Sequence, residues 1–206
     1  MFTTDDIPVN TPASTTDLGN MSSELSNAVL RLRTDGVDHV IFFELGAELS
    51  YFYFPLAESQ GYRPKYGIQS YQLPTLLVQN TPTAQFVGAE GIGWLPGDDV
   101  NPPDDPGGQA AATCKQLFNA VGLKGGTGRS VYCSDLFFLQ AALDRAPSIS
   151  VDGLRIGTES LGSSYQASGN IGTTFGPGEY DGSSLARQLS YVPSCTCFRY
   201  GADIRM

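Results

Sequence analysis

The sequence predicts an α/β fold organised around a parallel sheet. The main observation is a strand–helix–strand stretch over residues 37–71. Its first part, residues 37–43, is a near-continuous β-branched and aromatic run, which is typical of a strand buried on both faces of a parallel sheet. Apolar residues then recur at helical spacing, and a second short run at residues 65–68 completes one β-α-β crossover. Ligands of such sheets bind beyond the carboxyl ends of the strands.

Two elements are predicted before this crossover. Residues 4–9 are a candidate edge strand that contains a proline. After a polar loop, an apolar stripe between Met21 and Leu32 predicts an amphipathic helix, for which Ser22 or Ser23 is available as the N-cap. The first half of the chain therefore alternates helix and strand.

The elements after the crossover are shorter. Residues 73–78 predict a short helix or turn, and residues 85–95 predict a strand loosened by its glycines. Residues 96–108 combine three glycines, four prolines and four aspartates, which favours a solvated, extended connector. A calcium loop is the alternative for this connector, although its carboxylate spacing does not fit an EF-hand.

Helical spacing returns in the second half of the chain. Helices are predicted at residues 109–121, 134–145 and 151–161, and residues 165–182 are rich in glycine and serine. We therefore expect a parallel-sheet part followed by a largely helical C-terminal part.

Charge and composition exclude several classes of partner. The 206 residues are 41% hydrophobic and carry a net charge of −9. Nucleic acids and anionic membranes normally leave a basic footprint on their binding proteins, so we expect neither as a partner. No apolar run approaches the roughly 20 residues of a spanning helix, and the first residues lack the basic end and apolar body of a secretory signal.

The four cysteines point to an oxidising compartment. They allow three pairings, of which we favour Cys114 with Cys133 as a disulfide. Cys195 and Cys197 are too close in sequence to bond to each other without strain, so a second bridge there is less secure. A zinc site would usually need Cys-x2-Cys or histidine partners, and the single histidine, His39, lies inside a predicted strand.

The sequence offers no catalytic constellation. It has no Gly-x-Ser-x-Gly elbow, and its one histidine is expected to be packed or at a strand edge rather than catalytic. We therefore expect no enzyme activity, no resident metal and no cofactor.

Four segments follow one another along the chain: D-G-V-D-H-V-I-F-F, A-E-S-Q-G-Y-R-P-K-Y-G, F-V-G-A-E-G-I-G-W-L-P and the closing D-G-S-S-L-A-R-Q-L-S-Y-V-P-S-C-T-C-F-R-Y. In this order they resemble the type I periplasmic (solute-)binding proteins of ABC transporters, specifically the branched-chain amino acid and amide receptor class. The resemblance implies a clamshell of two α/β lobes that are joined by three crossing strands and close on a small polar ligand.

The resemblance also implies how the chain is divided. Residues 1–95 resemble the later part of the second lobe, residues 96–108 would be the connector, and residues 109–206 would return to finish the first lobe and end in a Cys-x-Cys tail. The hinge would lie at Trp94, Leu95, Pro96 and Gly97. The family's first-lobe half would precede residue 1, so the chain resembles the C-terminal part of a receptor.

Family ligand contacts map onto the two loops that follow the crossover strands. They fall on Glu44 and Leu45 in the first loop, and on Gln69, Ser70 and Tyr71 in the second. Glu44 would pair with a cation, or else cap the following helix, and Tyr71 would stack on the cation or cover an apolar tail. The alternative for Gln69 and Ser70 is ordinary turn hydrogen bonding.

The function implied is non-catalytic binding of an amino-acid- or amide-like ligand, outside the cell or in the periplasm, with an ABC transporter permease as a possible partner. The alternative is a structural or interaction fragment that has no ligand site and forms a homodimer through exposed lobe surface. A large exposed apolar patch would favour this alternative.

Overall fold

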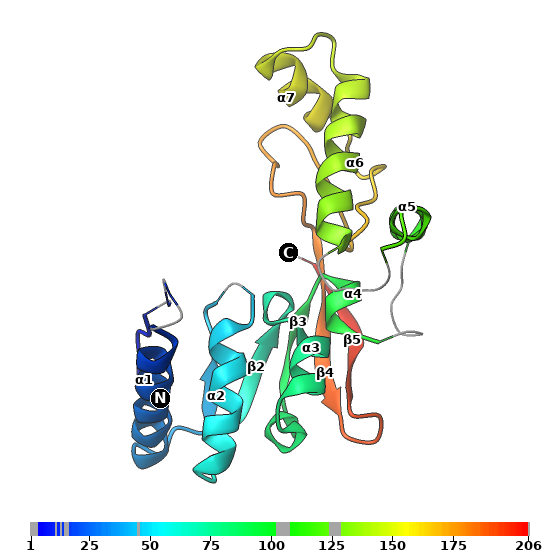
Figure 1. Ribbon diagram of the computed structural model, residues 1–206. Helices are drawn as coiled ribbons and strands as arrows, with labels where there is room; N and C mark the ends of the chain where they lie inside the picture. The colour runs from blue at the N-terminus through cyan, green and yellow to red at the C-terminus, as the bar shows by residue number, and fades with distance from the viewer. Residues whose placement is uncertain are drawn as a thin grey trace. The chain divides into compact units, whose positions relative to one another are not determined.

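The computed structural model describes residues 4–10, 12, 14, 17–44, 46–101, 108–123 and 129–205 (Figure 1). It confirms the α/β class, with a five-stranded sheet in the order β1-β2-β3-β4-β5. The chain divides into two compact units. Unit 1 comprises Met1–Gly91 and Ser190–Cys197, and unit 2 comprises Ile92–Leu189 and Phe198–Met206. No helix within the described ranges is long and apolar enough to cross a membrane.

The predicted crossover forms the centre of unit 1. Strand β1 (His39–Ile41) pairs in parallel with β2 (Lys65–Gln69), and Val40 lies opposite Tyr66. The prediction that β1 is buried on both faces is wrong, because β1 is the edge strand and alternates exposed, buried, exposed. Ile41 is 63% exposed, so only one face of this strand packs against the protein.

The three α-helices of unit 1 lie in the predicted places with different starts, whereas its two 3-10 helices were not predicted as helices. They are α1 (Asp17–Thr34), α2 (Glu48–Ser59), the 3-10 helix η1 (Ser70–Gln72), α3 (Pro74–Asn80) and the 3-10 helix η2 (Thr83–Phe86). Helices α1 and α2 lie side by side (Figure 1).

Two predictions for the start of the chain are wrong. Helix α1 begins at Asp17, so Ser22 and Ser23 lie inside it and Ser23 donates its hydroxyl back to the Gly19 carbonyl at 3.0 Å. Residues 4–9 form no strand. Nearby, Asn10 is held by Glu24, whose carboxylate accepts the Asn10 backbone N–H and side-chain amide at 3.1 Å each.

An aromatic cluster forms the core of unit 1. The Phe54 ring of α2 lies 4.8 Å from the Tyr66 ring of β2 and 4.9 Å from the Phe86 ring, both in edge-on geometry. Phe42 and Tyr53 join the same cluster, with their ring centroids 5.0 Å apart. Edge-to-face pairs of this kind add to the stabilisation from burial alone. Burial raises the pKa of the Tyr53 and Tyr66 hydroxyls.

One glycine allows the sheet of unit 1 to form. A Cβ atom on Gly91 would lie 1.7 Å from the Ile68 carbonyl oxygen, a distance that no side chain permits. Glycine at this position therefore lets the backbone of β3 (Glu90–Gly93) approach that of β2.

Unit 2 is largely helical, as predicted. It contains α4 (Pro96–Asp99), α5 (Gln109–Ala120), α6 (Arg129–Arg145) and α7 (Val151–Glu159). The sequence did not predict the closing hairpin of β4 (Leu185–Val192) and β5 (Cys197–Arg205). The chain passes from one unit to the other within β3, β4 and β5.

The region predicted as a glycine-loosened strand and solvated connector is more ordered than expected. Residues 83–86 form η2, so the strand is limited to Glu90–Gly93. Asp98 and Asp99 of α4 are buried, and Asp99 Oδ2 accepts the Leu95 N–H at 3.0 Å and the Tyr200 hydroxyl at 2.6 Å. The start of the connector is therefore not solvated, while its residues 102–107 lie outside the described residues.

Both cysteine pairs are disulfides. Cys114–Cys133 joins α5 to α6 and confirms the favoured pairing. Cys195–Cys197 also forms, within the turn between β4 and β5. The backbone of this turn therefore allows the Cys195–Cys197 disulfide, which the sequence predicted less firmly than Cys114–Cys133.

Candidate functional site

The structure brings together the two loops predicted to bind a ligand. They follow β1 and β2, which are parallel neighbours, so both loops leave the same edge of the sheet. The Gly46 N–H donates to the Tyr71 carbonyl at 3.0 Å, and the Gln69 Nε2 amide donates to the Glu44 carbonyl at 3.3 Å. The two loops are therefore hydrogen-bonded into one surface of unit 1. Leu45 lies outside the described residues.

Glu44 binds the N-terminus of α2. Its Oε2 accepts the backbone N–H of Leu49 at 2.7 Å and of Ser50 at 3.2 Å, while Oε1 has a 3.3 Å contact with the Ser50 N–H. The residue in the N-cap position, Ala47, has a positive φ of 66° and no capping side chain. Glu44 thus supplies the missing cap, which is the alternative that the sequence left open, and its half-buried carboxylate keeps one weakly engaged oxygen.

The second loop is held by a capping box. The Gln69 side-chain oxygen accepts the Tyr71 N–H at 2.9 Å, and the Gln69 N–H donates to Gln72 Oε1 at 3.0 Å. Ser70 is fully buried, whereas Tyr71 is 46% exposed. Turn hydrogen bonding therefore accounts for Gln69, and Tyr71 is the exposed aromatic of this loop.

Sequence reasoning missed Gln72 at this surface and expected Phe43, at the start of the first loop, to be buried. Gln72 is completely buried, and its Nε2 atom has no hydrogen-bond partner among the described residues. A buried amide without a partner is uncommon and marks a place for an ordered water or a ligand acceptor. Phe43 is 94% exposed, although a phenylalanine directly after a strand suggests core. The spacing Gln69-x-x-Gln72 was the only sequence signal for the amide.

The predicted hinge residues lie between β3 and α4. The Trp94 carbonyl accepts the Ile171 N–H at 3.1 Å, the Leu95 N–H is held by Asp99, and Pro96 and Gly97 form the first turn of α4. The boundary between the units falls a few residues earlier, between Gly91 and Ile92. The role of Trp94 to Gly97 as a hinge stays a prediction.

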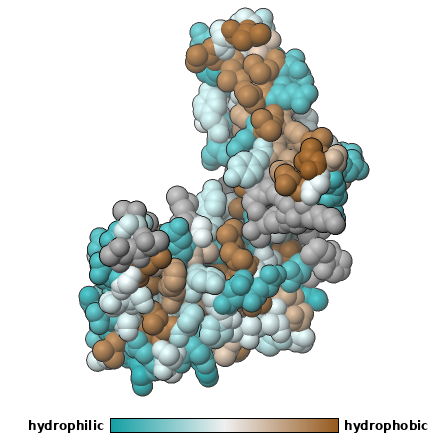
Figure 2. Space-filling view, viewed as in Figure 1, coloured by the Kyte–Doolittle hydropathy of each residue, from teal (hydrophilic) through white to brown (hydrophobic). Residues whose placement is uncertain are grey.

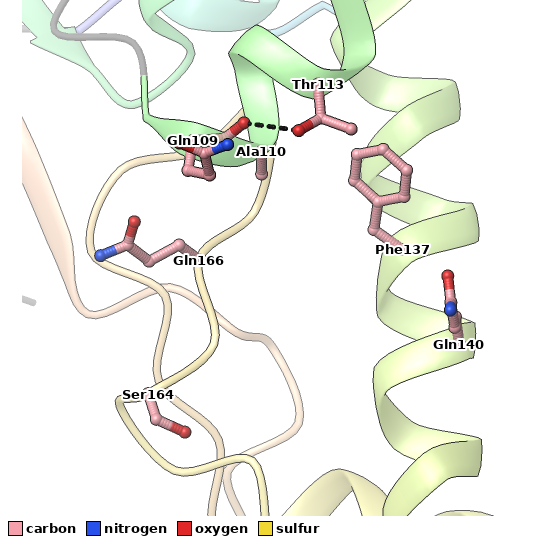
Figure 3. Close-up of a pocket in the computed structure, with 7 residues that line it drawn as sticks. All are labelled: Gln109, Ala110, Thr113, Phe137, Gln140, Ser164 and Gln166. Carbon is pink, nitrogen blue, oxygen red and sulfur yellow. Dashed lines mark hydrogen bonds between the residues drawn. The ribbon is translucent and has the colours of Figure 1, made fainter. Parts of the chain in front are cut away.

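Unit 2 contains a separate open pocket of about 430 Å³ between α5, α6 and the loop after α7 (Figure 3). Thr113 donates to the Gln109 carbonyl at 3.0 Å on one wall, and the Phe137 ring lies on another. Amides and hydroxyls make up the rest of the polar lining, and no charged side chain takes part: Gln109, Ala110, Thr113, Phe137, Gln140, Ser164 and Gln166. Neutral, solvent-exposed groups of this kind give the pocket little selectivity.

Metal chemistry has no support in the described part of the chain. No group of three or more His, Cys, Asp or Glu side chains is placed there to hold a metal ion. His39 is exposed at the edge of the sheet, where its Nδ1 lies 2.8 Å from Asp38 Oδ1. This hydrogen bond lowers the pKa of the Asp38 carboxyl. The predictions of no enzyme activity and no cofactor stay predictions.

Comparison with known proteins identifies the fold. No protein-family model matches the sequence, and no curated protein matches it. Among solved structures, an ABC transporter substrate-binding protein from Aeropyrum pernix is similar with a TM-score of 0.67 and 10% identity over 89% of this chain and 48% of that chain. A branched-chain amino acid ABC transporter protein from Thermus thermophilus with bound valine gives a TM-score of 0.61 and 10% identity, over 88% of this chain and 49% of that one.

A periplasmic binding protein type 1 from Bordetella pertussis Tohama I is similar with a TM-score of 0.56 and 19% identity, over 84% of this chain and 48% of that chain. These similarities confirm the predicted fold, which is part of the type I periplasmic-binding-protein fold. The chain spans about half the length of the solved structures that it matches.

Proposed function

We propose that the chain is part of a solute-binding protein that recognises a small polar, amino-acid- or amide-like ligand with the loops after β1 and β2. The observation that carries this proposal is the joining of these loops. Hydrogen bonds from Gly46 to Tyr71 and from Gln69 to Glu44 join the loops that carry a half-buried carboxylate, a buried amide and exposed aromatics, at the carboxyl ends of two parallel strands. Open α/β sheets bind their ligands at this edge.

The groups at this edge suit the two ends of an amino acid. Glu44 Oε1, the less engaged carboxylate oxygen, is available to an ammonium group. Gln72 Nε2 is a donor without a partner among the described residues and would suit a carboxylate or amide oxygen. Phe43 and Tyr71 would cover an apolar side chain. The Thermus thermophilus structure with bound valine supports this ligand class.

The mechanism under this proposal is a population shift between open and closed forms. A ligand favours the closed form because it contacts both lobes only there. Since the chain matches about half of each solved neighbour, the contacts of the other half would be missing, and we expect weak binding by this chain alone. The working protein would act outside the cell or in the periplasm and deliver its ligand to an ABC transporter permease.

Nuclear magnetic resonance titration of the ¹⁵N-labelled chain tests the site at weak affinity. Valine and valinamide share an ammonium group, and isobutyramide lacks it, so the series tests the charge of Glu44. We expect shift changes at Gly46, Gln69 and Gln72, which weaken for isobutyramide and in Glu44→Gln. Tyr71→Ala should weaken all three ligands, whereas Tyr180→Ala, an exposed tyrosine of unit 2, should not.

Absence of shift changes at these loops at high millimolar ligand would refute the site. Micromolar binding by the 206 residues alone would instead refute the dependence on a second half. A thermal-shift screen of amino acids, amides and small polyamines on this chain, and on a version extended upstream if the reading frame continues, separates these outcomes.

A second candidate function is an interaction role without a ligand site. The exposed apolar side chains of unit 2 favour it, including Leu136 at 67% and Val151 at 88% exposure. A chain that self-associates and gives no ligand response would support this role.

A further inference from the structure

The turn between β4 and β5 (Figure 1) carries a disulfide that differs from the other one in its surroundings. Cys195 and Cys197 are 2 positions apart in the sequence, whereas Cys114 and Cys133 are 19 apart. Cys114 and Cys133 are only 4% and 5% exposed, so the protein shields the bond between them. Cys195 is exposed, while Cys197 is 6% exposed. The short disulfide therefore has one cysteine at the surface and one inside the protein.

The backbone between these two cysteines has an unusual conformation. Thr196 has a positive φ of 52°, in the left-handed region that β-branched residues rarely adopt. Glycine or asparagine is the usual residue there, because other side chains come too close to the following carbonyl oxygen. A bond that holds Thr196 in this conformation carries part of its cost, and this cost is released when the bond opens.

The hairpin is anchored on both sides of the turn without this bond. Before the turn, the Tyr191 N–H donates to the Ala89 carbonyl at 3.1 Å, and the Tyr191 ring lies 5.6 Å from the Phe86 ring. After the turn, Phe198 is 1% exposed. A bond across so few residues restricts the unfolded chain little and adds little to the stability of the fold. The disulfide can therefore open and close while the chain stays folded.

We propose that Cys195–Cys197 is a thiol–disulfide exchange site, at which an external thiolate attacks the Cys195 sulfur. A new sulfur–sulfur bond joins the thiol to Cys195. The Cys195–Cys197 bond breaks, and its electron pair leaves on Cys197 Sγ, which takes up a proton from water. A second thiolate then attacks the external sulfur of this mixed disulfide and releases Cys195 as a thiolate. The net reaction oxidises two external thiols to a disulfide and reduces the protein's disulfide to two thiols.

The place of each cysteine assigns its role. Cys195 is the attacked residue because it is exposed, and Cys197 is the leaving residue because it is buried. Cys195 Sγ lies 3.3 Å from the Val192 carbonyl oxygen and 3.8 Å from the Cys197 carbonyl oxygen. After reduction the Cys195 S–H can donate to either oxygen, so the turn also offers a partner to the reduced form.

The exchange site is separate from the surfaces already described. It uses neither the ligand loops after β1 and β2 nor the apolar side chains that Figure 2 shows over unit 2. Exchange with thiols and binding of a solute can therefore fail separately.

Reduced glutathione tests the proposal, because this monothiol leaves a mixed disulfide that mass spectrometry can locate. The oxidised, folded chain is incubated with glutathione at neutral pH, quenched with N-ethylmaleimide and mapped. We expect glutathione on Cys195 and maleimide on Cys197, and we expect this bond to open roughly tenfold faster than Cys114–Cys133, or more. The control is the same reaction in guanidinium chloride, where both disulfides are accessible and the difference between their rates should become small.

A substitution tests the part played by the backbone. Asparagine tolerates the left-handed region, so Thr196→Asn should shift the equilibrium with glutathione toward the closed disulfide by roughly fivefold. Ser194→Asn is the matched control, at an exposed residue of the same turn whose φ is not positive, and should leave the equilibrium unchanged.

Three results overturn the proposal: equal opening rates of the two disulfides in the folded chain, glutathione on Cys197 instead of Cys195, or loss of the folded circular dichroism spectrum when the short bond opens. An equilibrium that Thr196→Asn does not shift would overturn the assignment of strain to Thr196.

Discussion

The two units of this chain hold together by different means. In unit 1, α2 and β2 bury large side chains against each other, and Phe54, Tyr53, Tyr66 and Phe86 are almost inaccessible. In unit 2, α5 buries Cys114 and α6 buries Cys133 and Ala142, while long apolar side chains remain exposed. Unit 1 is therefore held by a large aromatic core, whereas unit 2 combines a smaller core around Ala142, Leu161 and Phe175 with a covalent link between α5 and α6.

Glycines make the helix contact of unit 2 possible. A Cβ atom on Gly157 of α7 would lie 2.0 Å from the Ala142 carbonyl oxygen, and one on Gly153 would lie 2.0 Å from the Ser148 carbonyl oxygen. Backbone contacts of this kind bury little apolar area. This difference predicts that substitutions of large side chains will damage unit 1 most, and that the loss of a covalent or backbone contact will damage unit 2 most.

The largest expected effect is in the core of unit 1. Phe54→Ala removes a fully buried ring that contacts Tyr66 and Phe86, and should lower the free energy of unfolding by about 3–5 kcal/mol. Urea denaturation followed by tyrosine fluorescence measures this. Phe52→Ala, on the same helix but 37% exposed, is the control and should cost much less. Equal losses would mean that the aromatic cluster is not the core of the unit.

The second effect is in unit 2. Replacing both Cys114 and Cys133 by serine opens a link across 19 residues and should cost about 3 kcal/mol, because the unfolded chain regains the entropy of that loop. In the double serine variant, backbone amides of α5 and α6 should exchange faster with solvent than in the wild type, whereas the amides of α2 should exchange at the wild-type rate.

The control for this disulfide is the other one. Cys195 and Cys197 are 2 positions apart in the sequence, so their bond restricts the unfolded chain little, and its removal should cost less. If removing the Cys195–Cys197 disulfide lowered the stability of the chain as much as removing the Cys114–Cys133 disulfide, the entropic explanation would be wrong.

A smaller effect tests the glycine contact between α6 and α7. Gly157→Ala places a methyl group against the Ala142 carbonyl and should cost about 1–3 kcal/mol, because the helices must move apart. The same substitution at Gly97 of α4, where a Cβ atom would meet open space, should cost nothing. A neutral Gly157→Ala, measured by thermal denaturation, would show that α6 and α7 adjust freely.

The sequence predicts unit 1 better than unit 2 for a physical reason. The crossover of unit 1 can be predicted from a short stretch of sequence. The helical and strand periodicities of residues 37–71 predict which side chains are buried, and these side chains pack within the same unit. Strand β1 was mispredicted because a short edge strand with Phe42 and Phe43 after it has the composition of a central one. Whether β1 is an edge strand or a central strand depends on which strands pair with it, and hydrophobic periodicity does not predict this pairing.

The C-terminal hairpin and α4 were missed for a related reason. Strand β4 alternates weakly in composition, and the Cys-x-Cys turn resembles a tail. The sequence predicts Asp98 and Asp99 to be solvated, whereas both are buried, and the Tyr200 hydroxyl, about a hundred residues away in sequence, donates to Asp99 Oδ2. At the candidate site, the positions of Glu44, Gln69 and Tyr71 followed from the crossover, but the capping role of Glu44 depended on Ala47 taking a positive φ.

The smallest expected effect concerns a polar link in unit 1 and depends on pH. Arg63 donates to the Glu58 carboxylate, and Gln85 donates to Glu58 Oε2 at 2.7 Å; these bonds lower the pKa of Glu58 from its ordinary value of 4.5 to about 2. Because the folded pKa is depressed, the stabilisation is fully present above pH 4.5 and is lost as the pH falls through about 2. Glu58→Gln should therefore lower the urea midpoint at pH 7, with a difference that shrinks below pH 4.5. Glu90→Gln, at an exposed glutamate of the same unit, is the control. A pH-independent loss in Glu58→Gln would assign Glu58 a packing role rather than an ionic one.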